Sequence, residues 1–252
     1  MTLSGYPAEH PYRTVAGILL AIVFVVLATG VLNVLVVMGN LVQLALEEFL
    51  FAAIGIFLLA RFGWWGRAGY TTGIRREYLL LLILPAAVAL LSLGEGIRVT
   101  APLAVLAFAG LTLLVGFAEE TVFRGLIFTT LLPTGTIPAV FMSSLFFAAP
   151  HLLNIVGGIW NPAFAVADSV TAFGIGITFA AIRLRTGSIW PLVGLHALFD
   201  FCSLIVLGGI DVKAQSAQSL FTSVFFGVVF VVYGLFLLRN GKYRVQEKES
   251  PP

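Results

Sequence analysis

Charged residues and cysteine are both scarce in this chain of 252 residues. Only 10% of the residues are charged, with 14 basic and 12 acidic side chains, whereas a soluble domain carries roughly a quarter. This composition excludes a disordered chain and a nucleic-acid-binding protein that depends on a strongly charged surface. The single cysteine, Cys202, cannot form an intramolecular disulfide, which excludes a secreted disulfide-built module. We expect Cys202 to be a core residue.

Apolar residues, by contrast, are abundant and occur in long runs. They make up 60% of the chain, and the mean hydropathy is +1.05. A helix that crosses a bilayer needs about 20 apolar residues. Eight segments qualify, and turn residues such as glycine and proline separate them: Thr14–Met38, Leu44–Ala60, Tyr78–Leu93, Pro102–Leu132, Ile137–Val156, Pro162–Leu184, Ile189–Gly209 and Ser219–Leu238. We therefore predict an all-α, polytopic transmembrane bundle of about eight spans, which forms one domain over residues 1–252 and encloses a polar cavity.

The fourth predicted span, Pro102–Leu132, is longer than a bilayer crossing requires. A long hydrophobic segment can tilt, protrude from the membrane or break into two pieces. We expect one of these outcomes.

The basic residues predict the orientation of the bundle. Eight spans place both termini and the even-numbered loops on one side, and that side holds eleven basic residues: Arg13, Arg61, Arg67, Arg75, Arg76, Arg183, Arg185, Arg239, Lys242, Arg244 and Lys248. The opposite side holds only Arg98 and Lys213. Because basic loops remain on the cytoplasmic side, we predict a multi-pass protein of the cell membrane with cytoplasmic N- and C-termini.

Most charged residues lie near the ends of the predicted spans, but seven ionisable side chains fall inside the predicted hydrocarbon region: Glu119, Glu120, Arg124, His151, Asp168, His196 and Asp200. A charge at the centre of a membrane helix costs about 2.5–3.5 kcal/mol on insertion scales, so such residues normally face the bundle interior and have a function there. These seven are the candidate site residues.

The first cluster combines an ion pair with a free carboxyl. Glu120 and Arg124 are four residues apart, so they share a helix face and can pair. Glu119 points about 100° away from Glu120 and has no local partner. An apolar environment disfavours an unpaired carboxylate, which prepares Glu119 to accept a proton, as a general base must.

The other clusters are open to more than one interpretation. His151 follows Pro150, which tends to kink a helix, and a lone histidine in a span serves either helix–helix hydrogen bonding or catalysis. His196 and Asp200 share a helix face, where they could bind a metal, orient the imidazole for catalysis, or only satisfy each other. Asp168 has no partner on its own helix, and we interpret it as a packing residue.

The ordered set is more specific than its parts. Glu119-Glu120 with Arg124, then Phe147 with His151, then His196 with Asp200, resembles the three motifs of the CPBP family of intramembrane proteases. This family contains the type II CAAX prenyl endopeptidases together with bacteriocin-processing and abortive-infection-like proteins. The resemblance covers about residues 103–209.

The resemblance implies roles for these residues. Glu119 would activate water as the general base, and His151 would help to hold that water. His196 and Asp200 would stabilise the oxyanion, while Glu120 and Arg124 would keep the site in shape. The implied substrate is a membrane-anchored peptide or protein, prenylated or not, as in the C-terminal processing of prenylated proteins.

Two points depart from a simple transfer of these roles. Family members often have asparagine where this chain has Asp200, and an ionised aspartate accepts hydrogen bonds but does not donate them. We expect Asp200 to orient His196.

The family has also been described both as metal-independent and as metalloproteases. Glu119, His151, His196 and Asp200 could bind zinc, but the His-Glu-x-x-His signature is absent. We expect no required cofactor.

Other functions fit the sequence less well. Asp168 and Asp200 lack the Gly-x-Gly-Asp setting of an aspartyl intramembrane protease, and Ser143 and Ser144 lack a Gly-x-Ser-Gly setting. A transporter or ion relay could use the buried charges, although no inverted repeat is apparent. A non-catalytic immunity or binding protein of the same family is the remaining alternative.

Overall fold

A computed structural model describes residues 6–155, 161–209 and 216–239 of the chain. Eight helical segments in these ranges are long and apolar enough to cross a membrane, which confirms the predicted number. They are α2 (Pro11–Val36), α3 (Asn40–Phe62), the segment Arg76–Glu95 with α4 (Ile83–Leu91) at its centre, the segment Pro102–Thr134, the segment Thr136–Leu153, α8 (Pro162–Thr186), α9 (Trp190–Leu207) and α10 (Ala217–Arg239). A short helix, α1 (Tyr6–Glu9), precedes them. No strand occurs in the described ranges, as expected for an all-α bundle.

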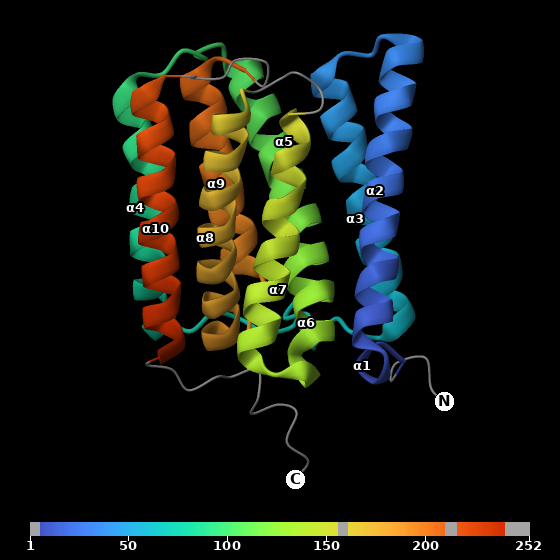
Figure 1. Cartoon of the computed structure of the whole chain (residues 1–252). Helices are drawn as coiled ribbons and strands as arrows, with labels where there is room; N and C mark the ends of the chain where they lie inside the picture. Colours follow the sequence, from blue (N-terminus) through green and yellow to red (C-terminus); the bar gives the residue numbers. More distant parts are fainter. Residues whose placement is uncertain (1–5, 156–160, 210–215, 240–252) are drawn as a thin grey trace.

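The helices stand side by side (Figure 1), with α2 and α3 at one side of the bundle and α4 and α10 at the other. Near the centre, α5 (Pro102–Glu120) packs against α3 and α9, while α8 packs against α7 (Thr136–Ala148) and α10. The start of α2 and the end of α10 lie at the same end of the bundle. This arrangement agrees with an even number of spans.

The fourth span changes its helical geometry instead of breaking. After α5, the chain forms a π-helical segment (Thr121–Ile127), a short α6 (Phe128–Leu131) and a 3₁₀ turn (Leu132–Thr134). All seven side chains of the π-helical segment are buried. Such segments are rare and are frequent at functional sites. The segment follows directly on Glu120, so the unusual backbone and the charge cluster coincide.

The fifth span also changes its helical geometry, at the proline where a kink is predicted. Helix α7 ends at Ala148, and a 3₁₀ helix (Ala149–Ile155) carries Pro150 and His151. The end of the predicted span, Val156, lies outside the described residues. Because proline cannot donate a backbone hydrogen bond, the change of helix type at this position is the expected local response.

Small residues allow the closest helix contacts. A Cβ atom at Gly174 of α8 would clash with the backbone oxygen of Gly227 in α10. The two helices are also joined by the Thr178 hydroxyl, which donates to the Phe230 carbonyl at 2.6 Å. Close backbone approach through glycine, with a hydroxyl hydrogen bond across the interface, is typical of helix pairs in membranes.

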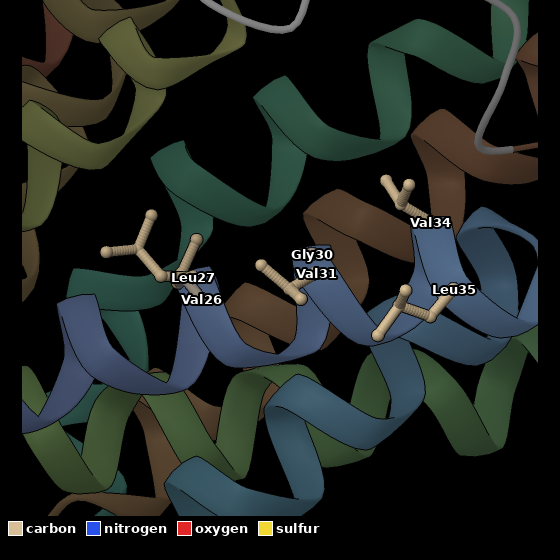
Figure 2. A pocket seen from close by; sticks show the side chains of 6 residues that line it. All are labelled: Val26, Leu27, Gly30, Val31, Val34 and Leu35. Atoms are coloured by element: carbon tan, nitrogen blue, oxygen red, sulfur yellow. The ribbon is translucent and has the colours of Figure 1, made fainter.

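The outward face of α2 is apolar. An open groove there is lined by Val26, Leu27, Gly30, Val31, Val34 and Leu35 (Figure 2). Candidate site residues do not line this groove, which suits the lipid-facing surface of a membrane helix. Cys202, in contrast, is buried, as predicted for a core residue.

Candidate active site

Six helical elements carry the candidate residues, including α8, which carries Asp168. Glu119 and Glu120 end α5, and Arg124 follows in the π-helical segment. Phe147 is close to the end of α7, and His151 lies in the 3₁₀ helix after it. His196 and Asp200 belong to α9.

Glu120 is the central acceptor of this cluster. Its Oε1 atom accepts a hydrogen bond from Nη1 of Arg124 at 3.0 Å, as the four-residue spacing predicts. The same oxygen lies 2.9 Å from Nδ1 of His196. Glu120 and Arg124 are both fully buried. An isolated charge would be very costly at such a position, so each of the two compensates the burial of the other.

Aromatic rings complete the surroundings of Arg124. The Cζ atom of its guanidinium group lies 4.0 Å from the centre of the Phe147 ring and 5.6 Å from that of Phe179. A cation over an aromatic face is favoured, and more so where water is excluded. Phe147 also contacts the imidazole of His196, with the two ring centres 5.8 Å apart. The phenylalanine of the second motif therefore links the buried ion pair to a site histidine.

His196 lies among three carboxyl groups. Nδ1 faces Glu120, while Nε2 lies 3.7 Å from Oε2 of Glu119 and 3.6 Å from Oδ2 of Asp200. The carboxyl closest to the ring is therefore that of Glu120, whereas the sequence pointed to Asp200 as the group that orients the imidazole. The Asp200 distance is too long for a direct hydrogen bond.

A close contact between helices places His196 against the end of α5. A Cβ atom at Gly116 would lie 2.7 Å from the carbonyl oxygen of Val193 and 3.3 Å from Cβ of His196. Only a residue without a side chain allows the two backbones to approach so closely. Gly116 lies one helical turn before Glu120, so this contact sets the distance between α9 and the glutamate pair.

The site combines sealed and accessible side chains. Glu120 and Arg124 are inaccessible, whereas the side chains of Glu119 and Asp200 are 24% and 37% exposed. His151 is 33% exposed. Ionisable groups that lie within a span and remain accessible can meet water or a substrate. Glu119 is thus the accessible member of the glutamate pair.

Sequence reasoning missed the partner of His151. Oδ2 of Asp168, in α8, lies 2.7 Å from Nδ1 of His151. The two residues are 17 positions apart and belong to different helices. The sequence offered one signal, a lone carboxylate inside a span, but its periodicity does not show which side chain of another helix lies opposite.

Sequence reasoning also missed Glu48, a buried carboxyl in α3. Its side chain is 3% exposed, and its Oε2 atom has no hydrogen-bond partner among the described residues. It interacts electrostatically with Glu119 and Asp200. The predicted span began at Leu44, which put Glu48 near a span end. The helix begins at Asn40, which puts it in the interior.

The proposed metal ligands do not form a metal site among the described residues. No group of three or more histidine, cysteine, aspartate or glutamate side chains in those ranges is placed to hold one ion. The Nδ1 contacts of His151 with Asp168 and of His196 with Glu120 leave Nε2 as the other nitrogen of each ring. In the described ranges, Glu119, His151, His196 and Asp200 are not gathered around one point at which three or more of them could hold an ion.

The central part of the chain is similar to a known protein family. Residues 100–202 match the family described as Type II CAAX prenyl endopeptidase Rce1-like. The match contains all three motifs and confirms the resemblance to the CPBP family. No curated protein and no solved structure matches the chain. The matched family is described as an endopeptidase family, and the eight long apolar helices support an integral multi-pass membrane protein.

Proposed function

We propose that this chain is an intramembrane endopeptidase, because residues 100–202 match a family of CAAX-type membrane proteases and contain a site suited to water activation. The observation that carries the proposal is the arrangement around His196. The accessible Glu119 lies 3.7 Å from Nε2 of His196, and Glu120 of the buried ion pair is hydrogen-bonded to Nδ1 of the same ring.

Glu119 is the general base of the proposed reaction. Glu119 takes a proton from water while the water oxygen attacks the carbonyl carbon of the scissile bond. The proton then passes from Glu119 to the leaving amine, which balances the reaction. Glu119 is suited to this task because Glu120, and not Glu119, forms the hydrogen bond with Arg124. General acid–base catalysis of this kind contributes typically about 10²–10⁴-fold in rate.

His196 is the hydrogen-bond donor to the oxyanion in the proposed reaction. The Glu120 carboxylate only accepts hydrogen bonds, so Nδ1 of His196 carries the proton that joins them. When the ring is doubly protonated, its Nε2–H group points away from Glu120. This group can donate to the oxyanion of the tetrahedral intermediate. Asp200 lies beside Nε2 and balances the charge of the ring.

The substrate we propose is a peptide or protein held at the membrane, with its scissile bond within reach of Glu119. The matched family suggests C-terminal processing of the CAAX type. Two peptides with the same sequence, one carrying an isoprenoid and one without it, test this point directly. Preferential cleavage of the prenylated peptide would support CAAX-type processing, and equal cleavage would contradict a requirement for the lipid.

The experiment that tests the function is cleavage of a membrane-tethered fluorogenic peptide by purified protein. Glu119→Gln removes the base without changing the size of the side chain, and we expect at least about a 100-fold loss of kcat. Glu47→Gln is the matched control, because Glu47 bonds instead to Thr29 and Gln43. We expect it to retain activity. Equal cleavage by Glu119→Gln and wild type would contradict the proposal, and an inactive wild type would favour the non-catalytic alternative.

The same assay tests the expectation that no metal is required. We expect full activity after treatment with a strong chelator, since the proposed ligands do not converge on one ion. Loss of activity that added zinc restores would overturn this expectation.

Asp200→Asn should retain activity if the carboxylate only balances charge, because the amide can also donate to an oxyanion.

A further inference from the structure

His151 and Asp168 form the shortest contact between site side chains that the motifs do not explain. Oδ2 of Asp168 lies 2.7 Å from Nδ1 of His151, and each side chain is 33% exposed. The pair joins two helical elements that flank residues 156–160 in the sequence. Asp168 is not part of the three motifs, so the proposed catalytic roles do not account for this carboxylate.

Local structure places both partners. Pro150 precedes His151 in the 3₁₀ helix that extends α7. On the other side, the Asn161 side chain caps α8 by accepting a hydrogen bond from the backbone nitrogen of Ala163 at 2.9 Å. An asparagine cap fixes the start of a helix. Asp168 lies seven residues after this cap, so α8 holds it opposite the imidazole.

The contact has a chemical consequence for the ring. An aspartate carboxylate accepts hydrogen bonds, so Nδ1 of His151 donates and carries the proton. In the neutral ring, Nε2 is then the unprotonated nitrogen. Besides Asp168, the side chains of Glu119, His196 and Asp200 interact electrostatically with this ring. Its Nε2 lone pair can therefore accept a hydrogen bond from water beside Glu119.

We propose that Asp168 is a positioning residue, which holds His151 in the Nδ1-protonated tautomer so that Nε2 accepts a hydrogen bond from the attacking water. This inference rests on the proposed function, because it concerns the same water that Glu119 activates. The opposite tautomer would present an Nε2–H group to that water. It would then engage a lone pair that the attack requires.

The direct test is nitrogen NMR of the protein labelled with ¹⁵N-histidine. The chain has only three histidines, so His151 is assignable by substitution. At a pH where the ring is neutral, we expect a protonated Nδ1 and an unprotonated Nε2. Asp168→Asn should move His151 toward the opposite tautomer, because the new amide can donate to Nδ1. Asp168→Glu should restore the original tautomer in part, and Glu47→Gln should leave the spectrum unchanged.

The kinetic test separates this inference from the proposed function. With the fluorogenic peptide, we expect Asp168→Asn to lower kcat about 10- to 100-fold while KM stays unchanged, and Asp168→Glu to recover part of the loss. A wild-type ring with the proton on Nε2, or a ring that Asp168→Asn does not alter, would overturn the inference. A changed tautomer with unchanged kcat would also overturn it. An inactive wild type would instead refute the proposed function, while the NMR result would still decide the tautomer.

Discussion

Arg124 is the residue that compensates the buried glutamate of the site. Its guanidinium group donates to Glu120 and lies over the ring of Phe147, while its Nε and Nη2 atoms have no hydrogen-bond partner among the described residues. Part of the compensation for burial therefore comes from the aromatic face. A buried charge that loses its partner is strongly destabilising.

Arg124→Leu should therefore destabilise the protein by about 3–5 kcal/mol, because Glu120 would remain buried without its cation. Unfolding of the detergent-solubilised protein measures this change. Arg75→Leu is the control, since Arg75 forms a pair with Glu77 in which both side chains are more than 60% exposed. Such a pair contributes roughly 0–1 kcal/mol. Similar losses in the two variants would argue against a buried ion pair at Arg124.

A second residue-scale prediction concerns Tyr70, in the loop between α3 and the third span. Its hydroxyl forms a hydrogen bond with Thr121, and burial raises the pKa of Tyr70 from 10.0 to about 12. Between these values the unfolded chain releases the phenolic proton while the folded protein keeps it. Stability should therefore fall as the pH rises from 10 to 12. Tyr70→Phe should lose this component of the pH dependence.

Unfolding measured at several pH values in this range tests the Tyr70 prediction. Tyr12→Phe is the control, because Tyr12 is 59% exposed and its substitution should leave the pH dependence of stability nearly as in the wild type. An identical pH dependence in Tyr70→Phe and wild type would show that the phenol is not protected by the fold.

At the scale of helical elements, two glycines of α5 separate the effect of a close helix–helix contact from the effect of helix propensity. Gly116 lies against the backbone of α9, whereas a Cβ atom at Gly110 would meet nothing within 4 Å. Gly116→Ala should push α9 away and move His196 from Glu120. We expect a loss of about 1–3 kcal/mol in stability and a fall in kcat. Gly110→Ala should be neutral or stabilising by up to about 1 kcal/mol, because alanine favours the helix.

Thermal unfolding and the peptide assay, applied to both glycine variants, check this prediction. Activity and stability that respond equally to the two substitutions would mean that the α5–α9 contact does not position the site.

The π-helical segment is a second feature at the scale of helical elements. Neither Arg124 nor Gly125 in this segment predicts a π-helix, so the sequence signal of the irregularity is the length of the fourth span.

At the scale of the whole molecule, charge asymmetry predicts orientation. The start of α2 and the end of α10 lie at the same end of the bundle (Figure 1), where Arg13 and Arg239 also belong. We predict that this end is cytoplasmic, because basic residues remain on that side of the membrane.

Reporter fusions at the C-terminus test the orientation. A phosphatase that requires export should be inactive in this position, while a fluorescent protein that folds in the cytoplasm should be active. A second fusion after Arg98, on the opposite side, should give the reverse pattern. An active phosphatase at the C-terminus would overturn the predicted orientation.

The sequence by itself determined the class of fold and the ion pair between Glu120 and Arg124. Apolar runs of this length cross a membrane only as helices, since a bilayer leaves no other partner for backbone groups than the helix itself or a closed barrel. The four-residue spacing likewise determined the pair Glu120–Arg124, because both residues lie on one helix.

Only the tertiary structure decided which groups meet across helices. Glu120 contacts His196, 76 positions away, and Asp168 contacts His151, 17 positions away. Helix periodicity determines the face on which a side chain lies, but the choice of neighbouring helix depends on packing details such as the Gly116 contact. For this reason the sequence pairs His196 with Asp200 on its own helix, whereas the carboxyl hydrogen-bonded to Nδ1 of His196 in the fold is that of Glu120.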